Sequence, residues 1–83
     1  MIVPILTIGH GEIEIYEIRI PKSWEGRPIQ ETLPEKGCPP IAGTRGGRAL
    51  LPSPDLQLEG GDLLHLSMTE ECATQFYKKV QEG

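Results

Sequence analysis

Glycine and proline interrupt this chain at short intervals, and their spacing limits its fold more than any other sequence feature. Ten Gly and eight Pro stand among 83 residues and alternate with periodic apolar runs. Such runs between turn-forming residues are typical of short strands and short helices, whereas a low-complexity tract would lack them. The sequence therefore predicts a small, turn-rich folded domain, and its length fits one domain and no more.

The charge and hydropathy totals exclude several classes of protein. Twelve Asp and Glu against eight Lys and Arg give a formal charge of −4, which disfavours nucleic-acid binding through phosphate neutralisation. No apolar stretch approaches the roughly 18 residues of a membrane span. The first residues, MIVPIL, lack the basic start and cleavage pattern of a secretory signal. We expect a cytoplasmic protein that does not insert into a membrane.

The run 12–20, EIEIYEIRI, is the strongest strand signal. Ile13 and Ile15 lie on one face of such a strand, whereas the apolar set that starts at Tyr16 lies on the other. A one-residue change in a period of two moves side chains to the opposite face. We therefore expect a bulge or bend near Ile15–Tyr16, or a strand that changes partners there.

The flanking segments complete a pattern of short elements. Residues 1–11 contain a proline in an apolar run, which indicates a connector or an edge strand ahead of a single domain at 12–83. Residues 23–33 predict a short helix, capped by Ser23 and ended by the proline that follows. The spacing of Ile29 and Leu33 places both on one helical face.

The second half of the chain predicts a hairpin, a last strand and a helix. Gly46-Gly47 is typical of a tight turn between strands at 41–45 and 48–51. A final strand at 63–68 is followed by a helix with Thr69 as its N-cap. The expected fold is α+β, with a small mixed or antiparallel sheet of four or five short strands, one short helix and a C-terminal helix.

Few residues offer catalytic or metal chemistry. Cys38 and Cys72 are separated by 34 positions without a C-x-x-C motif, so we expect two unpaired, small apolar side chains. His10 and His65 have no ligand spacing with either cysteine. No nucleophile–base pattern appears, and we therefore predict neither an enzyme nor a metal site.

Arg45 and Arg48 flank the Gly-Gly turn. Arginine guanidinium groups bind phosphates through two parallel hydrogen bonds, so two arginines at one hairpin of an acidic chain indicate an anion site. The alternative is a plain hairpin turn with two solvated side chains.

Four motifs in this order resemble the C-terminal domain of the regulators of potassium conductance, called RCK_C or TrkA-C. They cover about residues 12–80 and are Ser-x-x-Gly-x-x-Ile (Ser23, Gly26, Ile29), Ile-x-x-x-Arg (Ile41, Arg45), Pro-x-x-Asp (Pro52, Asp55) and Gly-Asp-x-Leu (Gly61, Asp62, Leu64). The sequence departs from the family at Gly43-Thr44, where members often have an apolar residue.

The resemblance implies a regulatory domain that senses a ligand, dimerises and controls potassium transport across a membrane. The implied partners are a second copy, and a membrane potassium channel or transporter or an upstream Rossmann domain, which would hold the chain at the cytoplasmic side of the membrane. The alternative is a structural dimerisation or protein-interaction module of a transporter with no small ligand.

The resemblance also implies a site. Some members bind cyclic di-AMP at the dimer interface, so the expected ligand is cyclic di-AMP or another small anionic nucleotide. The residues expected to bind it are Ile41, Ala42, Thr44, Arg45 and Arg48. The residues expected at the dimer interface are Ile18, Ile20, Leu50, Leu51 and Leu56.

Overall fold

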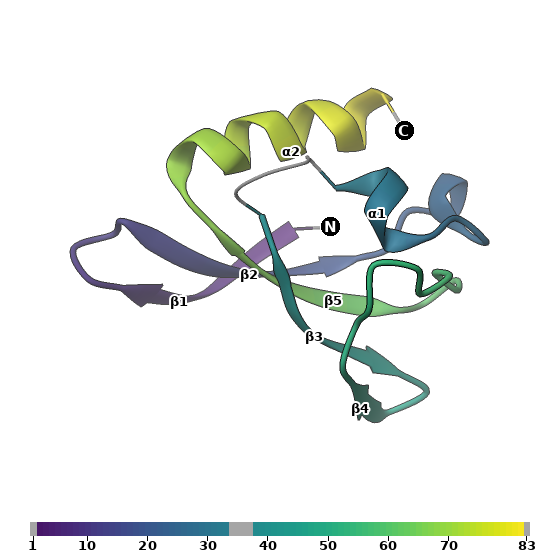
Figure 1. The fold of residues 1–83 in the computed structure, drawn as a ribbon. Helices are drawn as coiled ribbons and strands as arrows, with labels where there is room; N and C mark the ends of the chain where they lie inside the picture. Colours follow the sequence, from purple (N-terminus) through teal and green to yellow (C-terminus); the bar gives the residue numbers. More distant parts are fainter. Residues whose placement is uncertain (1, 34–37, 83) are drawn as a thin grey trace.

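A five-stranded antiparallel sheet carries the helices on one of its faces (Figure 1). The computed structural model describes residues 2–33 and 38–82. The elements are β1 (Ile2–Ile8), β2 (Ile13–Arg19), the 3₁₀ helix η1 (Lys22–Trp24), α1 (Ile29–Thr32), β3 (Pro40–Arg45), β4 (Arg48–Leu50), β5 (Leu63–Met68) and α2 (Glu70–Glu82). The strand order is β1-β2-β5-β3-β4, and every neighbouring pair is antiparallel. The α+β prediction is therefore confirmed, with an antiparallel rather than a mixed sheet.

The core lies between the sheet and the helices. Along β5 the buried residues Leu64, Leu66 and Met68 alternate with half-buried ones, so one face of this central strand meets the helices. The rings of Trp24 and Phe76 meet edge to face with centroids 6.0 Å apart, which joins η1 to α2. Both rings are at most 1% exposed, so this contact lies at the centre of the core.

The strand irregularity expected near Ile15–Tyr16 lies in the neighbouring strand. Strand β2 pairs with β5 in unbroken register, whereas the β1 register shifts between Pro4 and Leu6, directly opposite Ile15 and Tyr16. An extra residue in β2 would disturb pairing on both of its sides. Strand β1 is at the edge of the sheet, so a bulge there disturbs one ladder only.

The short helix predicted at 23–33 is wrong in its extent. Two pieces form instead, η1 and the four-residue α1, and Ser23 lies inside η1 without capping a helix. Gly26 adopts a φ of +81°, which ends any right-handed helix at that point. Pro28 then restricts the residue before it and stands immediately ahead of α1.

The C-terminal helix begins as predicted. The Thr69 hydroxyl accepts a hydrogen bond from the backbone N–H of Cys72 at 3.2 Å, which is the expected N-cap contact. Phe76 lies one turn further along and is fully buried. Near the other end, Lys79 Nζ donates to the carbonyl oxygen of Leu33 at 3.1 Å. Helix α2 is therefore attached to the chain around α1 as well as to the sheet.

The prediction of two unpaired cysteines is wrong. Cys38 and Cys72 form a disulfide, and their Cα atoms lie 5.7 Å apart. The fold brings the first turn of α2 over the chain just before β3, and this Cα separation is in the ordinary range for a disulfide. Their proximity is not visible in the sequence, because the two cysteines are 34 positions apart.

The Gly46-Gly47 hairpin is confirmed. Both glycines have positive φ, +57° and +78°, and Arg45 pairs with Arg48 across the turn. Two positive φ angles are the mark of a type I′ turn, which residues other than Gly and Asn rarely adopt.

Among the described residues, no helix is both long and apolar enough to cross a membrane.

Candidate functional site

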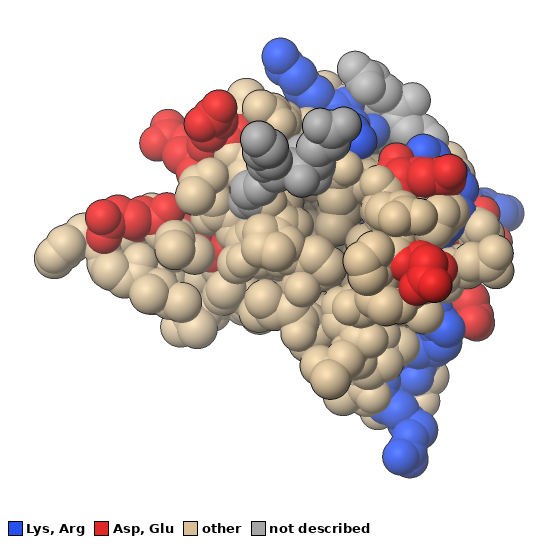
Figure 2. All heavy atoms as spheres, in the orientation of Figure 1, with Lys and Arg blue, Asp and Glu red and all other residues tan. Residues whose placement is uncertain are grey.

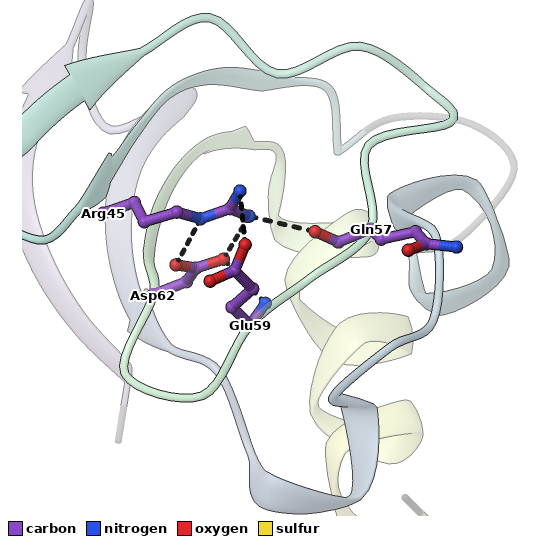
Figure 3. A network of polar contacts seen from close by, with 4 residues as sticks. All are labelled: Arg45, Gln57, Glu59 and Asp62. Carbon is purple, nitrogen blue, oxygen red and sulfur yellow. Dashed lines mark hydrogen bonds and ion pairs between the residues drawn. The ribbon is translucent and has the colours of Figure 1, made fainter.

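The guanidinium group of Arg45 lies at the centre of a polar network (Figure 3). Its Nε and Nη2 donate to the two carboxylate oxygens of Asp62 at 3.0 and 2.8 Å. Nη2 also donates to the carbonyl oxygen of Gln57 at 2.9 Å, and Nη1 lies 2.9 Å from a carboxylate oxygen of Glu59. Every nitrogen of this guanidinium therefore has a partner within the chain.

Neighbouring backbone positions Asp62 for this contact. Gly61 has a φ of +87° and turns the chain immediately ahead of β5, while the backbone N–H of Glu59 donates to Asp62 at 2.9 Å. The Arg45 hydrogen bonds are the main cause that lowers the pKa of the Asp62 carboxyl, against the opposing effect of burial. The same pairing raises the pKa of Arg45. The network fastens the end of β3 to the loop ahead of β5.

The two arginines of the hairpin differ in their partners. Arg45 points toward Asp62, whereas Arg48 is exposed and has no ion pair among the residues that the structure describes. The predicted anion site stays a prediction. An anion at this hairpin would find Arg48 available, but it would have to compete with Asp62 for Arg45.

The other residues expected to bind a ligand lie on β3. Ile41 is 47% exposed at the register shift between Pro40 and Ala42. Ala42 and Thr44 are half-buried and pair with His65 and Leu63 of β5. These partners belong to the face of the sheet opposite the helices, which we call the outer face.

The residues expected at a dimer interface lie in different environments. Ile18 and Ile20 are only 1% and 5% exposed, because the face that carries them is covered by the helices. A second copy would have no access to either. Leu50 and Leu56 are half-buried, and Leu56 packs against the core. Leu51 is 86% exposed.

A different apolar surface lies on the outer face of β1 and β2. We call it the outer patch, and its members are Val3, Leu6, Ile8, Ile13 and Ile15. The first four are 40–57% exposed. The cross-strand partners Leu6 and Ile15, and Ile8 and Ile13, place these side chains together. The sequence indicated this second apolar face, because Ile13 and Ile15 alternate with Ile18 and so point to the opposite side of β2.

Charged side chains are unevenly distributed around the β1–β2 hairpin on the visible face. In Figure 2 a surface without charged side chains extends below the β1–β2 hairpin, and most charged groups lie above it or to the right. Beside the patch, His65 Nε2 lies 3.7 Å from Glu17 Oε2 on the neighbouring strand.

Among the described residues, no three His, Cys, Asp or Glu side chains form a group that could hold a metal ion.

Residues 15–81 match the family model of the TrkA-C domain. The chain belongs to the TrkA-C family. This confirms the resemblance stated from the motifs. The TrkA-C match begins inside β2, so β1 and the turn after it lie ahead of the matched residues.

One curated relative is similar to this TrkA-C domain. It is the Trk system potassium uptake protein TrkA of Streptomyces coelicolor, 36% identical over 58 residues. The alignment covers 70% of this chain and 26% of that protein, so the chain spans about a quarter of the relative it matches.

Proposed function

We propose that this TrkA-C domain is a regulatory module of a potassium uptake system, that it works as a dimer, and that it responds to a small anionic ligand. The family match and the name of its relative support the link to potassium uptake. Membership of a family of regulatory domains also favours a binding module over an enzyme. In this proposal the domain lies in the cytoplasm and acts on a membrane potassium channel or transporter, directly or through an upstream Rossmann domain.

The outer patch is the main support for a dimer. Large exposed aliphatic side chains gathered on one sheet face are costly in water and mark a contact surface. A two-fold dimer places the same patch of both copies against each other, so a single apolar surface is sufficient. A domain of 83 residues has a small core, and such a contact would add to its stability.

The ligand is proposed to lie along β3 and the hairpin turn. Ile41, Ala42 and Thr44 offer a partly exposed, uncharged strand, and Arg48 offers a cation for a phosphate. Arg45 then has a positioning role, since its bonds to Asp62 hold the end of β3 in place. A ligand that binds one dimer geometry better than another shifts the population toward it.

Calorimetric titration with cyclic dinucleotides, cyclic di-AMP first, tests the ligand. We expect binding by the wild-type chain and a dissociation constant about tenfold or more weaker for Arg48→Ala, which loses a charge-assisted contact. Lys78→Ala is the control, because Lys78 is also an exposed cation but lies on α2. Absence of heat at high ligand concentration would contradict ligand sensing and favour a structural dimerisation module without a small ligand.

The dimer has its own test in thermal unfolding. If two copies associate only when folded, the melting temperature rises with protein concentration, because mass action favours the associated form. The buried Trp24 gives a fluorescence signal for unfolding. A melting temperature that stays constant across a hundredfold range of concentration would contradict the dimer, whatever the calorimetry shows.

A further inference from the structure

The disulfide between Cys38 and Cys72 links two parts of the chain that are far apart in sequence. Cys38 lies just ahead of β3 and Cys72 lies in the first turn of α2. Their Cα atoms are 5.7 Å apart, and the two residues are 3% and 2% exposed. The pair is therefore close enough to bond and shielded from solvent while α2 is in place.

The bond holds α2 at its beginning. The same helix is held further along by Phe76 against Trp24, and near its end by Lys79 Nζ on the carbonyl oxygen of Leu33. These later contacts are non-covalent and remain when the disulfide is broken. Two free thiols at Cys38 and Cys72 would still pack as small apolar side chains in the core. The fold is thus compatible with both redox states.

We infer that Cys38 and Cys72 form a reversible disulfide that exchanges with low-molecular-weight thiols and disulfides and sets how firmly α2 is attached. This inference rests on the proposed function in one respect, because a cytoplasmic regulator meets thiol pools that reduce most disulfides. Oxidation closes a loop between residues 34 positions apart and fixes the start of α2. Reduction leaves α2 attached through its connection to β5, the core and the Lys79 contact.

The exchange balances with a small disulfide RSSR as the oxidant. One protein thiolate attacks a sulfur of RSSR, forms a mixed disulfide and releases RS⁻. The second protein thiolate attacks the protein sulfur of that mixed disulfide, so the bond between Cys38 and Cys72 forms and a second RS⁻ leaves. The two protons of the protein thiols pass to the released thiolates, and one RSSR is reduced to two RSH. Because both cysteines are buried, the first turn of α2 or the chain at Cys38 must open for the attack.

The test uses the purified chain in mixtures of reduced and oxidised glutathione. Free thiols are alkylated at equilibrium and counted by mass spectrometry, starting from the oxidised and from the reduced protein. We expect both starting states to reach the same intermediate ratio and to cross from disulfide to dithiol within the buffer range. Thiols that stay free in the most oxidising mixture, or a bond that persists in the most reducing one, would overturn the inference.

The melting temperature of each state gives the second readout. We expect the oxidised wild-type chain to melt about 15 °C above the reduced one, from the loop that the bond closes. The Cys38→Ala/Cys72→Ala variant should show no response to the redox buffer. Equal melting temperatures of the two wild-type states would overturn the role assigned to the bond.

Hydrogen exchange on the wild-type chain keeps the inference testable if that variant does not fold. Amides at the start of α2 should exchange about tenfold or more faster after reduction, while those of β2 and β5 change little. Equal protection of α2 in both states would overturn the inference. Failure here would leave the dimer and ligand tests unaffected, because neither involves the cysteines.

Discussion

Arg45, whose side chain is 30% exposed, pairs with Asp62, whose side chain is only 5% exposed. Two parallel hydrogen bonds and the N–H of Glu59 offset the desolvation of the carboxylate. Both residues belong to the motifs that carried the family resemblance, Ile-x-x-x-Arg and Gly-Asp-x-Leu. The sequence marked each residue but gave no sign that they bind each other, because 17 positions separate them and only the pairing of β3 with β5 brings them together.

Replacement of Asp62 tests this contact. We expect Asp62→Asn to lower the free energy of unfolding by about 2–3 kcal/mol, since a charged partner of a bidentate pair is lost. Asp55→Asn is the control, because Asp55 is exposed and bonds only Ser53 among the described residues; we expect a change within about 0.5 kcal/mol. Urea unfolding followed by Trp24 fluorescence measures both. Equal stability of the two variants would contradict the structural role of the pair.

The lowered pKa of Asp62 also predicts a pH dependence. A carboxyl with a lower pKa in the folded than in the unfolded chain stabilises the fold above its unfolded pKa, about 3.9. That stability is lost as the pH falls through the folded pKa. The stability difference between wild type and Asp62→Asn should therefore be constant above about pH 5 and shrink below about pH 4. A difference that stays constant through this acid range would contradict the assignment.

At the scale of elements, the sequence predicted those helices, strands and turns whose conformation depends on neighbouring residues alone. The alternation in β5, the Thr69 cap and the Gly46-Gly47 turn depend on neighbouring residues and were confirmed. The bulge opposite Ile15 was misplaced because strand pairing decides which strand holds the extra residue. The two apolar faces of β2 could not be ranked from sequence, since only the position of the helices determines which one is covered.

Gly43 shows how tightly β3 packs between its neighbours. A Cβ at this position would lie 3.1 Å from Leu50 Cδ1, 3.2 Å from the carbonyl oxygen of Leu63 and 3.3 Å from Leu64 Cδ2. We therefore expect Gly43→Val to destabilise the fold by about 1–3 kcal/mol through overpacking. Ala42→Val, on the outer face of the same strand, should change stability by less than about 1 kcal/mol. Thermal unfolding compares the two, and a Gly43→Val variant as stable as wild type would contradict this packing.

At the scale of the molecule, the sheet has one apolar face beneath the helices and an exposed apolar patch on the β1–β2 end of the other face. The prediction that a small domain needs a partner followed from length and thin apolar content, but the surface was assigned to Ile18 and Ile20, which the helices bury. The residues on the opposite face of β2, together with β1, form the outer patch instead. We propose that two copies of the chain meet through this patch.

Sedimentation equilibrium on two leucine variants shows whether this patch is the dimer contact. Leu6 and Leu51 are both exposed, at 57% and 86%, but only Leu6 belongs to the outer patch. We predict a dimer for the wild type and for Leu51→Asp, and weakening of association for Leu6→Asp by at least about 30-fold, or about 2 kcal/mol. A monomeric wild type at high micromolar concentration, or a Leu6→Asp variant that dimerises as well as Leu51→Asp, would contradict the account.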